Sequence, residues 1–229
     1  TGCFCIMNTG ENPVISKNRM LTTIGYQING KVTYALEGSV FVSGAVVQWL
    51  RDQLGIIKSA PEIEALAKTV ENNGGVTFIP ALAGLGAPYW DPHATGSIMG
   101  ITRGTQKGHI ARASLEAIAM RTREIVIEMQ KDANTTFKIL KVDGGGSTND
   151  LLMQIQSDLL QVEVIRPKTT ETTALGVAFF AGLASGYWPS IESLSSIWEI
   201  DKKFNPKKGK QNKIIIETWK NKISQVTKN

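Results

Sequence analysis

The spacing of apolar residues near the start of the chain predicts an antiparallel sheet. Runs of the strand type, apolar or alternating, occupy residues 3–7, 21–27 and 32–36. Asn29-Gly30, between the second and third runs, is a residue pair that favours a tight hairpin turn. We therefore expect three strands, of which the last two form a hairpin.

After these strands the pattern changes to helices and strands. Further elements are expected as helices at 43–54, 61–71, 110–129, 149–160 and 172–185, and as strands at 76–79, 137–142 and 162–165. A long loop rich in glycine, proline and aromatic residues covers 81–96. Three antiparallel strands followed by alternating helices and strands are the order of the α/β class with a ribonuclease-H-like or actin-like fold, here with 61–101 as an inserted excursion.

Nucleases and the nucleotide-binding halves of kinases share this order of elements, so the order alone does not choose between them. A two-metal nuclease needs carboxylates on its central strands. The strand at 3–7 has none, and Asp143 is the only candidate at this end of the predicted sheet. The sequence therefore favours nucleotide binding over nuclease chemistry.

A glycine-rich turn joins the strand at 137–142 to the following helix. It reads Asp143-Gly144-Gly145-Gly146-Ser147-Thr148-Asn149. Glycine permits positive φ and the close approach of a ligand, while serine, threonine and asparagine cap helices whose first N–H groups attract phosphate. The turn is typical of a nucleotide site, although a turn that only packs a helix on a sheet carries the same residues.

Composition predicts a globular protein without a membrane segment. The 229 residues are 42% hydrophobic, enough for one large or two small domains. The most apolar stretch, 174–183, is too short to span a bilayer, and no secretory leader is visible. Cys3 and Cys5 are expected to be core residues in a reducing compartment, which indicates a soluble, cytoplasmic protein. The chain begins at Thr1 on a strand-like run, so we expect it to be part of a longer protein.

The net charge of +5 comes from the end of the chain. Residues 201–229 hold nine lysines against Asp201 and Glu217, which gives +7 there and −2 for the remainder. This tail lacks interleaved arginines and aromatic pairs, so it is more typical of a solvated surface than of a nucleic-acid interface. We expect no nucleic-acid partner.

Several motifs together resemble a known family. One segment reads Gly96-Ser97-Ile98-Met99-Gly100-Ile101, followed after seven residues by His109-Ile110-Ala111-Arg112-Ala113-Ser114-Leu115-Glu116. This segment fits the second signature of the FGGY carbohydrate kinases, and the chain resembles their C-terminal half. Thr1-Gly2-Cys3-Phe4 and the segment 84–91 are closer to the glycerol-phosphorylating members than to the pentulose kinases. The resemblance implies a nucleotide-binding domain at 1–195, with a basic helical tail at 196–229 packed on it.

The resemblance also implies roles for particular residues. It assigns ATP contacts to Thr1, Gly44, Gln48, Gly145 and Asn149. Gly44 and Gln48 are four apart, so they share one face of the first helix. Gly145 would admit the adenosine, and Asn149 would both cap the next helix and donate its amide to the nucleotide.

Other candidate residues receive weaker or structural roles. The resemblance places Phe4 against the carbon chain of glycerol, although a phenylalanine on a strand is often a core residue. Asp143 is expected to support the turn rather than act as the base. His93 and His109 have no metal-ligand partner at suitable spacing. The Tyr89-Trp90-Asp91 loop is expected to pack between domains.

In this family ATP and Mg²⁺ act in a cleft between two similar domains, and the aspartate that serves as base precedes Thr1. The resemblance therefore implies that this chain carries one side of an ATP:glycerol phosphotransferase, with no catalytic residue of its own, and is inactive without the missing N-terminal half. A homo-oligomer is possible. The alternatives are a kinase for a related polyol or pentulose, and a non-catalytic actin-like binding or scaffold module.

Overall fold

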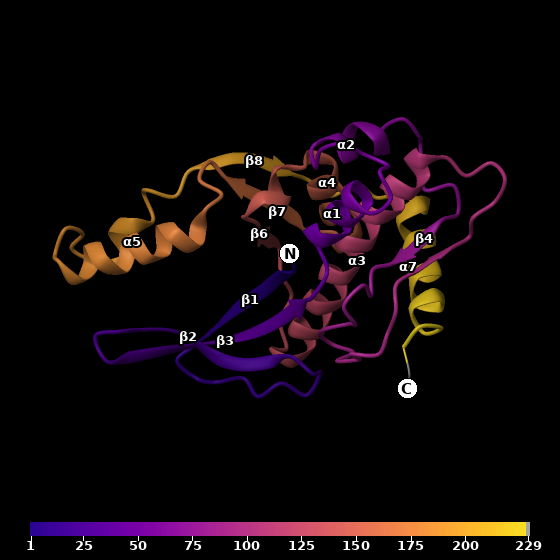
Figure 1. Cartoon of the computed structure of the whole chain (residues 1–229). Coiled ribbons are helices and arrows are strands. Elements are labelled where there is room, and N and C mark those ends of the chain that lie inside the picture. The colour runs from indigo at the N-terminus through magenta and orange to yellow at the C-terminus, as the bar shows by residue number, and fades with distance from the viewer. Residues whose placement is uncertain (228–229) are drawn as a thin grey trace.

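The first three strands form the predicted antiparallel sheet. In the computed structural model, which describes residues 1–227, they are β1 (Cys3–Gly10), β2 (Leu21–Ile28) and β3 (Lys31–Val40), in the order β1-β3-β2 (Figure 1). Asn29 and Gly30 have φ values of 50° and 78° and join the paired residues Ile28 and Lys31. Two successive positive φ values are those of the hairpin turn that Asn-Gly predicts.

A long helix, α3 (Lys107–Asp132), forms the centre of the molecule. Residues from Ala111 to Met129 are buried at intervals along it, and it contacts β1, β3, β4, α2 and α4. Its start is capped by side chains, since the Gln106 N–H donates to Nδ1 of His109 at 3.0 Å. The predicted helix at 110–129 is confirmed, with three further residues at each end, and this cap stabilises the added residues at the start.

The excursion at 61–101 contains one strand that the sequence pattern missed. It follows α1 (Gly44–Asp52), and its elements are α2 (Glu62–Ala67), β4 (Thr77–Ile79) and β5 (Ser97–Met99). β4 and β5 pair antiparallel across the long loop. A strand of three residues has too little periodicity to be recognised alone, and the partner strand decides its conformation. The predicted helix at 61–71 is shorter in the structure.

The last part of the chain alternates as predicted, then adds a strand. It comprises β6 (Ile139–Lys141), the short 3-10 helix η1 (Gly145–Thr148), α4 (Asp150–Leu160), β7 (Glu163–Pro167), α5 (Thr172–Ala184), α6 (Ile191–Leu194), β8 (Ile200–Phe204) and α7 (Lys210–Ile223). β6 and β7 are parallel, and β8 joins β7 antiparallel. The expectation of a purely helical tail at 196–229 is therefore wrong for β8, whose sequence Ile-Asp-Lys-Lys-Phe becomes a strand by pairing with the buried β7.

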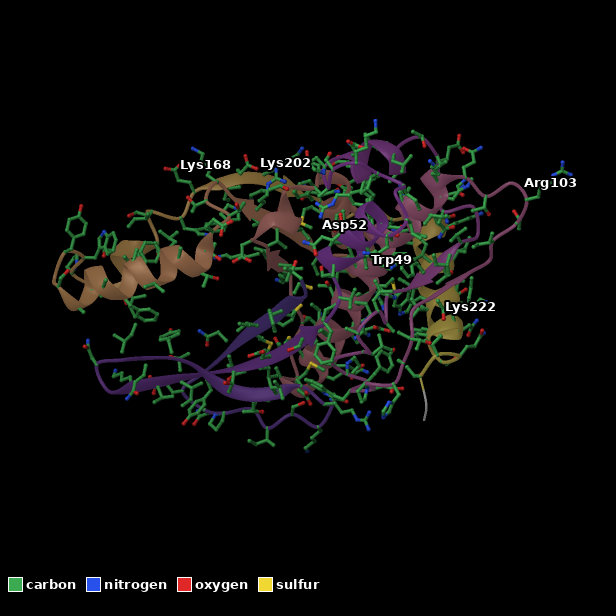
Figure 2. The ribbon with its side chains drawn as sticks, viewed as in Figure 1. Trp49, Asp52, Arg103, Lys168, Lys202 and Lys222 are labelled. Atoms are coloured by element: carbon green, nitrogen blue, oxygen red, sulfur yellow. The ribbon has the colours of Figure 1, made fainter. Side chains whose placement is uncertain are left out.

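The basic tail serves the core as well as the surface. Ile215, Trp219 and Ile223 lie one helical turn apart on α7 and are buried in the main core with residues of α3 and β4. Figure 2 shows Lys202 on β8 and Lys222 on α7, on different parts of the surface. Of the described lysines of the tail, Lys202 and Lys203 lie on β8, Lys207 and Lys208 lie between the two elements, and the others lie on α7.

By contrast, α5 projects from the body of the molecule (Figure 1). It is the most apolar helix in composition, yet only Gly182 is buried, and Val177 and Phe180 are exposed. Within the described residues no helix combines the length and the apolar character needed to cross a bilayer.

Removal of the Trp219 side chain should destabilise the protein strongly. Trp219 is 2% exposed, and its Nε1 donates to Oε1 of Glu124 at 2.7 Å. We expect Trp219→Ala to lower the free energy of unfolding by about 3 to 5 kcal/mol, as large core truncations do. Ile214→Ala on the exposed side of α7 is the matched control and should cost less than about 1 kcal/mol. Equal losses in urea unfolding would show that α7 does not belong to the core.

Candidate functional site

The predicted site residues form two sets, each held by its own contacts. In the first, the carbonyl oxygen of Thr1 accepts hydrogen bonds from the N–H groups of Ser43 at 3.1 Å and Ala45 at 3.0 Å. The Thr1 nitrogen donates to Oε1 of Gln48 at 3.5 Å. A Cβ added to Gly44 would lie 2.9 Å from the Thr1 hydroxyl oxygen. The structure therefore brings Thr1, Gly44 and Gln48 together at the start of α1.

The second set is the glycine-rich turn before α4. Gly144 has φ of 71° and ψ of 175°, and its N–H donates to the carbonyl of Thr170 at 2.8 Å. Oδ1 of Asn149 accepts from the N–H of Leu152 at 2.8 Å, which is the predicted helix cap. A Cβ added to Gly145 would meet no atom within 4 Å. The turn therefore presents an open surface at Gly145, directly before a capped helix N-terminus.

The backbone constraint in this turn lies at Gly144 and not at Gly145. A φ of 71° with ψ of 175° is a region that essentially only glycine occupies. Gly145 has no such positive φ. The backbone angle therefore does not require glycine at position 145, and what the structure shows there is open space in front of the residue.

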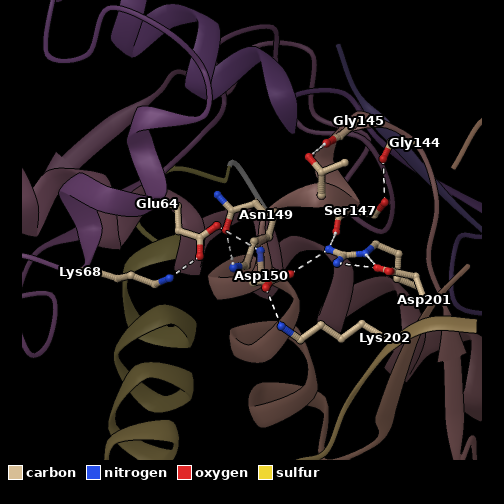
Figure 3. A network of polar contacts seen from close by, with 12 residues as sticks. Glu64, Lys68, Gly144, Gly145, Ser147, Asn149, Asp150, Asp201 and Lys202 are labelled. Atoms are coloured by element: carbon tan, nitrogen blue, oxygen red, sulfur yellow. Dashed lines mark hydrogen bonds and ion pairs between the residues drawn. The ribbon is translucent and has the colours of Figure 1, made fainter. Parts of the chain in front are cut away.

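Charged residues brace the turn from β7 and β8, as Figure 3 shows. Nη1 of Arg166 donates to the carbonyl of Ser147 at 2.7 Å and to Oδ1 of Asp150 at 2.9 Å. Nε of Arg166 donates to Oδ2 of Asp201 at 2.7 Å. Nζ of Lys202 donates to Oδ2 of Asp150 at 2.6 Å. Hydrogen bonds from Lys202 and from Arg166 lower the pKa of the Asp150 carboxyl, so it is ionised at neutral pH.

The excursion also reaches this turn. Oε2 of Glu64, on α2, accepts the N–H of Asp150 at 3.1 Å, and Lys68 pairs with the same carboxylate. Figure 3 shows Glu64 and Lys68 on one side of Asp150 and Lys202 on the other. The start of α4 is therefore held from two sides.

Phe4 lies on the exposed face of β1. It is 66% exposed and its neighbour Ile6 68% exposed, whereas Cys3 and Cys5 point to the other face and pack against the core. Both thiols are free, and burial raises the pKa of each. Among the described residues Phe4 is therefore not part of the core, and its ring is exposed.

The remaining candidates have structural contacts. Asp143 accepts a hydrogen bond from the hydroxyl of Thr172 at the start of α5, and burial, followed by the charge of Glu171, raises its pKa. His109 caps α3, as described above. Within residues 1–227 no group of three or more His, Cys, Asp or Glu side chains is placed to bind a metal ion.

The aromatic loop is fastened within this chain. The hydroxyl of Tyr89 donates to Oε1 of Glu124 at 2.6 Å, and Nε1 of Trp90 donates to the carbonyl of Arg19 at 2.8 Å. Asp91 accepts the N–H groups of His93 and Ala94. These bonds tie the loop to α3 and to the segment before β2, and its packing between domains stays a prediction.

A family model matches the part of the chain that holds these residues. The model described as the FGGY family of carbohydrate kinases, C-terminal domain, matches residues 1–185. The chain belongs to the FGGY family. The match covers both sets of site residues and ends at the close of α5.

Relatives of this FGGY domain extend well beyond it. A curated protein named glycerol kinase from Deinococcus radiodurans is 55% identical over 226 residues, which cover 98% of this chain and 45% of the relative. A solved structure described as Plasmodium falciparum glycerol kinase with ADP has a TM-score of 0.90 at 36% identity and covers all of this chain and 46% of that one. The chain thus spans about half the length of the curated relatives it matches.

More distant structures show the same fold. The xylulose kinase from Lactobacillus acidophilus, described as ligand bound, has a TM-score of 0.80 at 23% identity over 99% of this chain. The predicted actin-like α/β fold of the FGGY domain is therefore confirmed.

Sequence reasoning missed the residues that brace the turn. Arg166 is a charged residue next to the buried pair Val164 and Ile165 in the strand Glu163-Val164-Ile165-Arg166-Pro167. A charge in such a run needs partners, and this was the signal available in the sequence. The identity of the partners, from η1, α4 and β8, follows only from the fold.

Alanine at two neighbouring glycines should have different effects on stability. We expect Gly144→Ala to lower the free energy of unfolding by about 1 to 3 kcal/mol, because its backbone conformation is nearly restricted to glycine. Gly145→Ala should change it by less than about 0.5 kcal/mol, since the added methyl group meets open space. Thermal unfolding of both variants beside the unmodified protein tests this. A larger loss at Gly145 would contradict the geometry of the turn.

Proposed function

We propose that this chain is the nucleotide-binding half of an ATP-dependent glycerol kinase, which transfers the terminal phosphoryl group of ATP to glycerol. The observation that carries the proposal is the open turn at Gly145, placed before the capped start of α4. Support comes from the 55% identical relative named glycerol kinase and from the 36% identical structure described with ADP. The two free thiols support a cytoplasmic location, where such groups stay reduced.

The proposed contacts follow from which atoms are already used. Oδ1 of Asn149 caps α4, so its amide Nδ2 is the group that would donate to the nucleotide. Gly145 would leave room for the adenosine. Gln48 and Gly44, beside Thr1, would face the phosphate end, where the Thr1 hydroxyl and backbone can approach oxygen atoms. Phe4, exposed on β1, would pack against the carbon chain of glycerol.

Phosphoryl transfer needs in-line positioning and neutralisation of charge from both sides of the nucleotide. In the proposed enzyme Mg²⁺ neutralises phosphate charge. The described residues hold no group of three or more His, Cys, Asp or Glu side chains that could bind this ion. Magnesium at kinase sites is held largely by substrate phosphates, water and one or two carboxylates. We expect the carboxylates, including the general base, in the other half of the protein.

Phosphorylation assays of the full-length protein test the proposal directly. We expect ATP-dependent phosphorylation of glycerol, with kcat/KM at least about tenfold above that for xylulose, a preference of about 1.4 kcal/mol. The present chain alone should show no turnover above a buffer control, because positioning from one side is insufficient. A preference for xylulose, or turnover by the chain alone, would overturn the proposal.

Two substitutions at Asn149 separate its capping from its proposed contact with ATP. Asn149→Ser retains an oxygen for the cap and loses the amide donor without adding a charge, so stability should be kept while the KM for ATP rises by about tenfold or more. Asn149→Ala should raise the KM for ATP and also lower the free energy of unfolding by about 1 kcal/mol. An unchanged KM for ATP in Asn149→Ser would limit the residue to capping.

Gly145→Val tests the open turn. A branched side chain would occupy the volume proposed for the adenosine, so the KM for ATP should rise much more than the KM for glycerol. Steady-state kinetics of the full-length enzyme measures both. If only the KM for glycerol rose, the glycine turn would belong to the polyol site.

A further inference from the structure

Arg166 contacts the glycine turn with a nearly buried side chain. Its side chain is 12% exposed and bonds to the carbonyl of Ser147 and to the carboxylates of Asp150 and Asp201. The guanidinium also lies over the ring of Phe204, with its central carbon 5.6 Å from the centroid. One residue of β7 thus joins η1, the first turn of α4, and β8.

The turn needs such a brace because its own residues constrain it weakly. Gly144, Gly145 and Gly146 follow one another, and glycine has more backbone freedom to lose than any other residue. Arg166 binds the backbone of η1 at the carbonyl of Ser147, and it binds α4 at Asp150, the first residue of that helix. Of the proposed nucleotide contacts, Gly145 lies two residues before Ser147, and Asn149 directly precedes Asp150.

Arg166 also affects the charge beside the site. Asp150 follows Asn149 directly, and an unpaired carboxylate there would repel the phosphates of a nucleotide. Arg166 and Lys202 each pair with one of its oxygens, at 2.9 Å and 2.6 Å. The carboxylate can then stay ionised at the positive end of α4 without adding a net negative charge to the site.

We propose that Arg166 is a positioning residue for the nucleotide, acting through Ser147 and Asp150 on the Gly145–Asn149 turn. The proposal rests on the proposed function of that turn. Arginine suits this position because its planar fork bonds to a carbonyl and to two carboxylates at once, whereas lysine is a single point charge. Arg166→Lys would therefore keep an ion pair and lose some of the hydrogen bonds to the turn.

Variants of the full-length enzyme test this role. In Arg166→Met the KM for ATP should rise by about tenfold or more, corresponding to about 1.4 kcal/mol, with the KM for glycerol within about twofold. Arg166→Lys should fall between this variant and the unmodified enzyme. Lys168→Met is the matched control, because Lys168 lies two residues from Arg166 and its described ion pair is with Glu199. The KM values of Lys168→Met for ATP and for glycerol should not change.

A second measurement does not depend on turnover. Amide hydrogen exchange over 144–152 should become faster in Arg166→Met and stay unchanged in Lys168→Met. If Arg166→Met does not fold, Asp201→Asn, which loosens Arg166 from β8, should show the same changes to a smaller degree.

The outcomes separate this proposal from the proposed function. Unchanged exchange in the turn, or equal increases in the KM for ATP and for glycerol, would overturn the role of Arg166. An unmodified enzyme without ATP-dependent phosphorylation of glycerol would overturn the proposed function. Faster exchange in Arg166→Met would then still show that Arg166 holds the turn in place, but the proposed role of Arg166 in positioning ATP would be contradicted.

Discussion

A charged pair inside α3 is the interaction on which the rest of the structure depends. Arg121 is 1% exposed, and a charge that is buried to this extent must be paired and fully hydrogen-bonded. Its guanidinium pairs with Glu124, donates to the carbonyl of Ala87 at 2.6 Å and lies 4.9 Å from the ring centroid of Tyr89. Glu124 in turn accepts from Tyr89 and Trp219. Three segments far apart in sequence, the aromatic loop, α3 and α7, therefore share one polar cluster.

The site takes its position from this centre through α4. Nε of Arg123 donates to the carbonyl of Leu159 at 2.9 Å, and Nε2 of Gln156 donates to the carbonyl of Ala119 at 3.2 Å, so the body of α4 is fastened to α3. The start of α4 is held by other contacts: Asn149 caps it, and Arg166 and Glu64 bind it from different elements. The start of α4 is thereby fixed in place, with the N–H groups of Asp150 and Leu152 already accepted by Glu64 and Asn149.

Local sequence features predicted the parts of the site that depend on neighbours in the chain. The Asn149 cap and the Asn29-Gly30 hairpin follow from residues within a few positions of each other, and both are found. The glycine-rich turn at 144–146 was located correctly, but three consecutive glycines look alike in a pattern, so the positive φ at Gly144 alone is known only from the structure. Roles in ATP binding stay predictions, since they depend on a ligand and on the other half of the protein.

The sequence by itself determined the order of the elements, the α/β class and the family, because apolar periodicity, turn residues and motif spacing are all properties of short segments. Only the tertiary structure decided which distant residues meet. Arg166 lies 19 positions from Ser147, and Glu64 lies 86 positions from Asp150. Strand β8 and the exposure of Phe4 likewise depend on what packs against each face. Such pairings are selected by burial and charge compensation over the whole fold, and no local pattern contains them.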